Sequence, residues 1–172
     1  MGSPSESGED VALRPVTPSD WPMLLNWLHE PAVKRWWGNP SAAEAEVRIV
    51  LETPSAIGRI IEVSGKPVGY AHAIDAVYWG ENLPDVLPPW TWDVDLFIGE
   101  AAFRGRNIGG AGLDQLAAEV FGSTLAMALS VFVSVRNEAA VRAYERAGFQ
   151  WVTVWEDPTG GPEWLMLRQR PS

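Results

Sequence analysis

The stretch that decides the fold is FRGRNIGGAG at residues 103–112, where two arginines stand beside four glycines. It leads directly into LDQLAAEVF, which has the pattern of a helix. A glycine-rich turn that feeds a helix N-terminus binds phosphate, because free backbone N–H groups and the positive end of the helix dipole face the anion. The stretch lacks the Lys-Ser/Thr of a P-loop, so a plain tight turn stays open as the alternative reading.

The segments on both sides of this turn predict one mixed α/β domain. We expect a disordered tail over residues 1–10 and a single domain over residues 11–172. Strands are expected at 11–16, 57–63, 66–77, 91–98, 126–135, 151–156 and 163–169. Helices are expected at 17–30, 31–37, 41–53, 108–121 and 137–149.

Composition narrows the classes of function. The 172 residues include no cysteine, which excludes disulfides and thiol catalysis, and only two histidines, so we expect no metal site. The net charge of −9 argues against nucleic acid as a partner and is compatible with a cationic one. No apolar run is long enough to span a membrane, and the first residues lack the apolar segment of a signal peptide, so we expect a cytoplasmic protein.

Acidic and aromatic residues gather between Lys66 and Arg104, a stretch without any other Lys or Arg. In the strand at 91–98, the period of two places Asp93 and Asp95 on one face and Trp92 on the other. Two carboxylates on one face repel each other unless a cation lies between them. The segment therefore predicts a cation site with aromatic walls; a solvated edge strand with a wet loop is the alternative.

Trp36 and Trp37 pose a similar choice on the expected helix at 31–37. Neighbouring helical side chains point about 100° apart, so both cannot face the same core. One of them lines a pocket in the first reading, and we select Trp37. Both pack beneath the following helix in the second.

Two motifs resemble the GCN5-related N-acetyltransferase (GNAT) superfamily. Arg106-x-x-Gly109-x-Ala111 fits its Arg/Gln-x-x-Gly-x-Gly/Ala signature, and VRNEAAVRAYERAGF at 135–149 is similar to its second segment. The resemblance covers roughly residues 11–169, and several segments, DVDLFIG among them, look like aminoglycoside 6′-N-acetyltransferases. It implies a mostly antiparallel central sheet, splayed between the fourth and fifth strands, with helices on both faces.

The resemblance also implies a cofactor and two catalytic residues. Tyr144 corresponds to the acid that protonates the leaving thiolate, and Asp95 to the carboxylate that binds the substrate amine or acts as its base. The residues expected to bind acetyl-CoA are Phe97, Ile98, Arg104, Arg106, Asn107, Ile108, Gly109, Gly110, Ala111 and Asn137.

The acceptor that the resemblance implies is an aminoglycoside, acetylated at its 6′-amino group by direct transfer in a ternary complex, which would confer antibiotic resistance. The residues expected to bind it are Trp37, Trp79, Glu81, Trp90, Trp92, Asp93 and Asp95. The sequence departs from the family at VFVSVRN, where Phe132 replaces an acidic residue. His72 is read either as a packed strand residue or as a side chain that points into the site. We expect a monomer or a homodimer.

Two other functions stay open. A siderophore-type lysine N-acyltransferase, or another N-acetyltransferase of polyamine-like small molecules, is the alternative enzyme. The siderophore branch has a His-x-x-x-Val-x-x-Trp-Trp-like helix, matched from His29 to Trp37, but its strand-borne histidine base is missing from TWDVDLFI. A non-catalytic module that binds coenzyme A or cations is the third.

Overall fold

The computed structural model describes residues 9–80, 82–157 and 160–172. The strands are β1 (Val11–Pro15), β2 (Ile57–Val63), β3 (Lys66–Asp75), β4 (Thr91–Ile98), β5 (Ala128–Ser134), β6 (Gln150–Asp157) and β7 (Gly161–Gln169). The α-helices are α1 (Trp21–Leu28), α2 (Pro31–Trp37), α3 (Pro40–Glu52), α4 (Ile108–Ser123) and α5 (Glu138–Arg146). Among the described residues, no helix is both long and apolar enough to cross a membrane.

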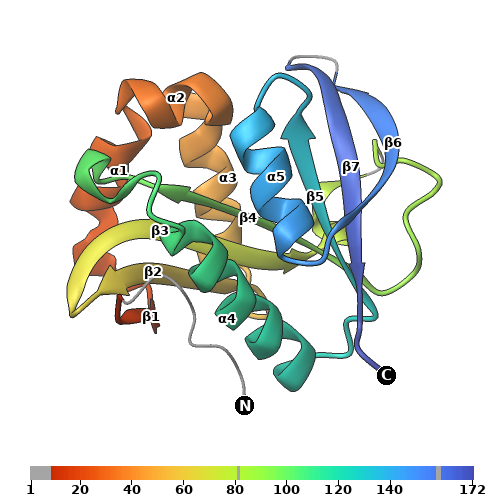
Figure 1. The fold of residues 1–172 in the computed structure, drawn as a ribbon, viewed down its shortest axis with the longest axis horizontal. Coiled ribbons are helices and arrows are strands. Elements are labelled where there is room, and N and C mark those ends of the chain that lie inside the picture. The colour runs from red at the N-terminus through yellow and green to blue at the C-terminus, as the bar shows by residue number, and fades with distance from the viewer. Residues whose placement is uncertain (1–8, 81, 158–159) are drawn as a thin grey trace.

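All seven strands form one sheet in the order β1-β2-β3-β4-β5-β7-β6 (Figure 1). Neighbouring strands are antiparallel except β4 and β5, which run parallel. This parallel pair is short: it extends from Thr91 opposite Ala128 to Asp93 opposite Ser130, although β4 continues to Ile98 and β5 to Ser134. The sheet therefore splays between β4 and β5, and the mixed, mostly antiparallel architecture predicted from the sequence is confirmed.

Helices cover both faces of the sheet, and each face has its own apolar core. On one face α4 and α5 lie across the sheet (Figure 1), and Leu116 and Val120 of α4 are fully buried there. On the other face α1, α2 and α3 pack around Tyr70 and Phe97 of the central strands. The strand face that carries Asp93 and Asp95 is thus the face covered by α1–α3, because Tyr70 and Phe97 alternate with the same period.

The first helix differs from its expected bounds. Thr17 caps the segment as predicted, but residues Pro18–Asp20 form a 3-10 turn and the α-helix begins only at Trp21. Pro22 has no backbone N–H to donate to the carbonyl four residues earlier, so regular α-helical bonding starts after it. Asp20 is held by Arg14 of β1, with a guanidinium–carboxylate distance of 2.8 Å, which ties this turn to the sheet edge.

Candidate active site

The turn before α4 has the geometry that its glycines predict. Gly105 and Asn107 adopt left-handed backbone conformations, with φ values of 72° and 57°. The first α-helical bond runs from the Ala111 N–H to the Asn107 carbonyl, so the N–H groups of residues 108–110 have no partner within the helix. A β-carbon on Gly110 would lie 2.5 Å from Asn107 Oδ1, so a larger residue at this position requires the Asn107 side chain to rotate away. The turn leaves a cradle of free N–H groups at a helix N-terminus, which is an anion site.

The side chains of the two arginines in the turn contact other parts of the protein rather than the free N–H groups of the cradle. Arg104 donates from Nε to the Ile98 carbonyl at 2.9 Å and from Nη2 to the Gly99 carbonyl at 2.8 Å, which fixes the turn to the end of β4. Arg106 donates to the Ala102 carbonyl, lies over the Phe103 ring and forms an ion pair with Glu9. The Arg106 side chain does not line either of the cavities described below. Only the backbone of this residue is therefore available for the expected contact with the cofactor.

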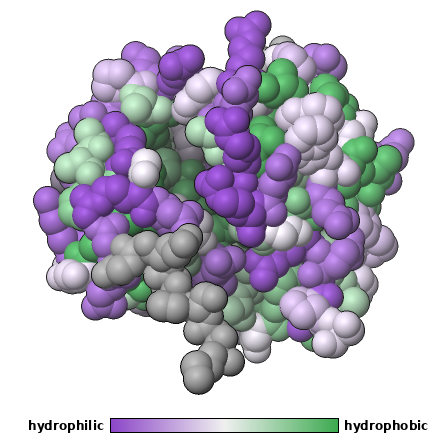
Figure 2. Space-filling view, in the orientation of Figure 1, coloured by the Kyte–Doolittle hydropathy of each residue, from purple (hydrophilic) through white to green (hydrophobic). Residues whose placement is uncertain are grey.

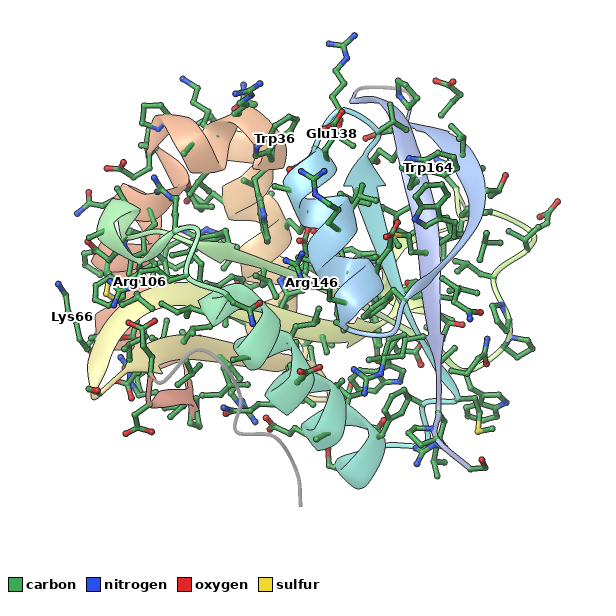
Figure 3. The ribbon with its side chains drawn as sticks, viewed as in Figure 1. Trp36, Lys66, Arg106, Glu138, Arg146 and Trp164 are labelled. Atoms are coloured by element: carbon green, nitrogen blue, oxygen red, sulfur yellow. The ribbon has the colours of Figure 1, made fainter. Side chains whose placement is uncertain are left out.

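A cavity of about 470 Å³ runs from this turn into the splay, and we call it the turn-side cavity. Its walls are the end of β4 (Asp95 to Ile98), the turn from Arg104 to Gly110, the end of β5 and one side of α5. Figure 2 shows a hollow with an apolar floor between the α1–α2 side and α5. Trp36 and Arg146, which both line the turn-side cavity, stand on its opposite sides in Figure 3.

Most residues expected at the cofactor line the turn-side cavity. They are Phe97, Ile98, Arg104, Asn107, Ile108, Gly109, Gly110 and Asn137. Arg106 and Ala111 do not line it. Asn137 also caps α5, since its Oδ1 accepts from the Ala140 N–H at 3.2 Å. Arg146 is a lining cation that the sequence analysis missed, because a basic residue in the last turn of a helix is ordinary.

A second cavity of about 860 Å³ adjoins the first, and we call it the acidic cavity. Its lining contains five carboxylates, Glu46, Asp93, Asp95, Asp157 and Glu163, against two guanidinium groups, Arg35 and Arg136. The two cavities share Trp36, Trp37, Asp95, Phe132, Ser134 and Glu163. A phosphate-bearing ligand in the turn-side cavity and a cationic ligand in the acidic cavity would therefore meet at Asp95.

Asp95 and Tyr144 lie at this meeting point. Asp95 Oδ1 accepts from the Leu96 N–H at 2.8 Å. Burial raises the pKa of Asp95 well above its usual value, and the nearby charges of Glu46 and Asp93 add to the effect. Burial also raises the pKa of Tyr144 well above 10, with further contributions from the carboxylates and from a hydrogen bond with Asp95. Tyr144 is thus a protonated hydroxyl in contact with a carboxylate of increased basicity.

Asp93 is the inner neighbour of Asp95 and has only 7% of its surface exposed. Its Oδ1 accepts from the Ser130 hydroxyl at 2.8 Å, and its Oδ2 accepts from Trp79 Nε1 at 2.9 Å. Burial raises its pKa to about 7 in spite of these two donors. Asp93 therefore carries less negative charge near neutral pH than an exposed aspartate, and it holds Trp79 in the wall of the acidic cavity.

The tryptophans separate into two groups. Trp37 lines both cavities and donates to the Leu96 carbonyl at 3.4 Å, and Trp79 lines the acidic cavity, as predicted for both. Trp90 and Trp92 were also expected at the acceptor, but the structure places both outside the two cavities. Trp92 lies in the core on the opposite face of β4, and Trp90 is 62% exposed at a turn outside both cavities. Glu81 lies outside the described residues.

Sequence reasoning missed Glu46 and Glu163. Glu46 lies on α3, and burial within the cavity wall raises its pKa to about 8, with Asp93 and Glu163 adding to the effect, although about a third of its side chain is exposed. Glu163 lies on β7, and burial followed by the charge of Asp157 raises its pKa to about 7. Neither residue stands in a distinctive local pattern, because Glu46 reads as part of an ordinary helix and Glu163 as part of a hairpin. Phe132, which the sequence places where the family has an acid, does line both cavities.

A mixed sheet splayed between its fourth and fifth strands, with a glycine-rich turn at the N-terminus of the next helix, is the architecture expected for the GNAT class of acetyltransferases. The model of the acetyltransferase (GNAT) domain family matches residues 17–156, and the chain belongs to this family. The superfamily predicted from the two motifs is confirmed.

Several known proteins similar to this chain are named as aminoglycoside acetyltransferases. The aminoglycoside N(6′)-acetyltransferase type 1 of Klebsiella pneumoniae is 27% identical over 174 residues, which cover 96% of this chain and 86% of that protein. The protein of the same name from Serratia marcescens gives the same values. A crystal structure of the aminoglycoside acetyltransferase AAC(6′)-Ib with coenzyme A and kanamycin has a TM-score of 0.81 at 26% identity, covering 94% of this chain and 95% of the other. A structure of AAC(6′)-Ib with paromomycin and acetyl-CoA has the same TM-score and identity, with 94% of each chain covered.

Proposed function

We propose that the protein is an acetyl-CoA-dependent N-acetyltransferase that modifies the 6′-amino group of aminoglycosides by direct transfer in a ternary complex. The observation that carries the proposal is the position of Asp95, which lines both cavities and whose charge acts on the Tyr144 hydroxyl. The names of the relatives and the ligands in their structures support the same activity.

The turn-side cavity fits acetyl-CoA. The free N–H groups of residues 108–110 suit its pyrophosphate, and a β-carbon on Gly110 would push against the Asn107 side chain beside them. Arg146 supplies a positive charge on the α5 wall of the same cavity. The splay leaves the edge of β4 beyond Asp93 unpaired with β5, which leaves room for the extended arm of the cofactor.

The acidic cavity fits a polycation such as an aminoglycoside. Without one, the mutual repulsion of the carboxylates contributes to the raised pKa values of Glu46, Asp93 and Asp95. Ammonium groups would lower those pKa values and offset the repulsion. Trp37 and Trp79 in the walls provide faces for cationic sugar rings.

The chemistry follows from the pair at the junction. Acetyl-CoA supplies a thioester whose carbonyl carbon takes the amine nitrogen and whose thiolate leaves. Asp95 accepts a proton from the substrate ammonium, and burial, the main cause of its raised pKa, still makes it a better base than an exposed aspartate when the amine is bound. Tyr144 donates its proton to the departing sulfur, and its raised pKa keeps that proton in place until then. The N–C bond forms as the C–S bond breaks.

The test is thiol release from acetyl-CoA with two matched acceptors, one with a 6′-amino group and one with a 6′-hydroxyl. Turnover with the first alone is the expected result. Asp95→Asn should lower kcat/KM by about 100-fold or more, whereas Asp114→Asn, on the exposed face of α4, should not. Equal rates with both acceptors would place the reaction on another nitrogen. No thiol release with either would end the aminoglycoside proposal and direct attention to lysine and polyamine acceptors.

The residues of the site give less support to the two alternative functions. His29, which the siderophore-type reading uses, donates from Nδ1 to the Leu25 carbonyl at the end of α1 and lines neither cavity. A non-catalytic binding module would have no use for a tyrosine hydroxyl paired to a buried carboxylate between two cavities.

A further inference from the structure

One row of side chains crosses three strands on the face of the sheet that lines the acidic cavity. Trp155 of β6 is directly opposite Glu163 of β7, and Glu163 is directly opposite Ser134 of β5. Residues directly opposite on neighbouring antiparallel strands have their β-carbons about 5 Å apart on the same face. All three side chains line the acidic cavity, so the row forms one continuous strip of its wall.

The two outer members of this row, Trp155 and Glu163, have no part in the proposed reaction. Each is partly exposed, unlike His72, which is fully buried and lines neither cavity. Among the described residues, no hydrogen-bond donor and no cation is paired with the Glu163 carboxylate. An unpaired carboxylate beside an aromatic ring in a cavity wall suits a ligand that brings a positive charge.

The row extends away from the reacting end of the acidic cavity. The strand order β4-β5-β7-β6 puts Glu163 two strands and Trp155 three strands from Asp95, with β6 at the edge of the sheet (Figure 1). At about 4.8 Å per strand, Trp155 lies about 14 Å from Asp95 along the sheet. The splay between β4 and β5 adds to this separation. A ligand with its amine at Asp95 therefore reaches Trp155 only if it extends well beyond one sugar ring.

We propose that Trp155 and Glu163 form a distal subsite for a third, cationic ring of the acceptor, in which Trp155 packs against the ring and Glu163 pairs with its ammonium group. The first ring then holds the reacting amine, and the second spans the cavity. The cavity of about 860 Å³ has a size that encloses a ligand of this kind. The inference rests on the proposed function and narrows its substrate class to three-ring aminoglycosides whose third ring carries an amine.

The subsite acts on affinity for the acceptor rather than on proton transfer, which takes place at Asp95 and Tyr144. A two-ring acceptor ends before the subsite, and a neutral third ring would leave Glu163 without a counter-charge. Loss of the subsite should therefore raise KM for a three-ring cationic acceptor and leave kcat close to its wild-type value.

Kinetics with neamine and kanamycin B test the subsite, because neamine is kanamycin B without its 3-amino-3-deoxyglucose ring. Assays at pH 8 keep Glu163 ionised, since burial, followed by the charge of Asp157, raises its pKa to about 7. Glu163→Gln keeps the shape of the side chain and removes its charge, so kcat/KM for kanamycin B should fall about 10- to 100-fold. Trp155→Leu should lower it about three- to tenfold. Both variants should leave kcat/KM for neamine unchanged within about twofold.

Two variants on β6 control for the substitutions themselves. Glu156 is exposed, adjoins Trp155 in the chain and lines neither cavity, so Glu156→Gln makes the same change of charge outside the site. Trp151 is 53% exposed and also lines neither cavity, so Trp151→Leu removes a tryptophan from the same strand. Both controls should keep the wild-type ratio of kcat/KM for kanamycin B and neamine.

Calorimetry gives a readout that needs no turnover. The wild-type protein should bind kanamycin B about tenfold or more tightly than neamine, and Glu163→Gln should remove most of this difference. That result without thiol release would support the subsite and remove the proposed reaction. Thiol release with equal losses for both acceptors in Glu163→Gln, or with none, would overturn the subsite and leave the acetyltransferase proposal standing. Equal affinity of the wild-type protein for the two compounds would overturn the subsite directly.

Discussion

Replacing Tyr144 with phenylalanine removes one hydroxyl from the junction of the two cavities and little else. The ring stays packed in the core, where it meets Phe149 at a centroid distance of 5.6 Å and where 8% of the residue is exposed. Asp95 keeps its hydrogen bond from the Leu96 N–H. A loss of at most about 1 kcal/mol of folding stability is therefore expected from removal of the hydroxyl.

The kinetic effect should be much larger than the effect on stability. Loss of a general acid costs about 100- to 10,000-fold in rate, or about 2.7–5.4 kcal/mol in activation free energy. We expect kcat for thiol release to fall within that range, with little change in KM for acetyl-CoA. In the wild type, Tyr144 should produce no decline in kcat below pH 10, since its pKa lies well above that value.

The assay is steady-state thiol release with a 6′-amino aminoglycoside, together with thermal unfolding of the same samples. Tyr78→Phe is the matched control, because that tyrosine is 53% exposed and lines neither cavity. A kcat for Tyr144→Phe within about threefold of wild type would refute the assignment of the acid. A loss of activity that parallels unfolding would show a structural role instead.

Three further changes test the site. Burial raises the pKa of Asp93 from 3.8 to about 7, so ionising Asp93 opposes folding by at most about 4 kcal/mol. The free energy of unfolding should therefore fall as pH increases from 4 to 7. Asp93→Asn should flatten that dependence in urea titrations. Gly110→Ala places a methyl group 2.5 Å from Asn107 Oδ1 and forces the Asn107 side chain to rotate beside the free N–H groups, so KM for acetyl-CoA should rise. Gly122→Ala, which meets open space on the same helix, should leave KM unchanged, and equal KM values for the two variants would argue against the cradle. Arg146→Ala should weaken acetyl-CoA binding about three- to tenfold by calorimetry, with a smaller effect at high salt, and unchanged affinity would remove it from the site.

The local patterns in the sequence predict the fold well because each depends on few residues. The glycines of the turn, the cap at Asn137 and the alternation of the strand at Thr91–Ile98 act within a few positions, and each appears in the structure as expected. The error at the first helix has the same local origin, since Pro22 interrupts the hydrogen bonds that the apolar pattern alone suggests.

The site is predicted only where one strand supplies it. Asp93 and Asp95 follow from alternation, but the same alternation sends Trp92 to the opposite core. Glu46 and Glu163 enter the acidic cavity from α3 and β7, far from β4 in the sequence, and only the tertiary arrangement brings them there. The lack of a hydrogen-bond partner at His72 Nε2 depends on every polar group around it, which a one-dimensional pattern does not contain.

The most direct test of the central claim is the destination of a labelled acetyl group. The protein would be incubated with carbon-13 acetyl-CoA and kanamycin B, and both the product and the protein would be analysed by NMR and mass spectrometry. The account predicts a single label on the 6′ nitrogen and none on the protein. A label on another nitrogen, on an oxygen or on the protein itself would contradict direct transfer at the junction of the two cavities.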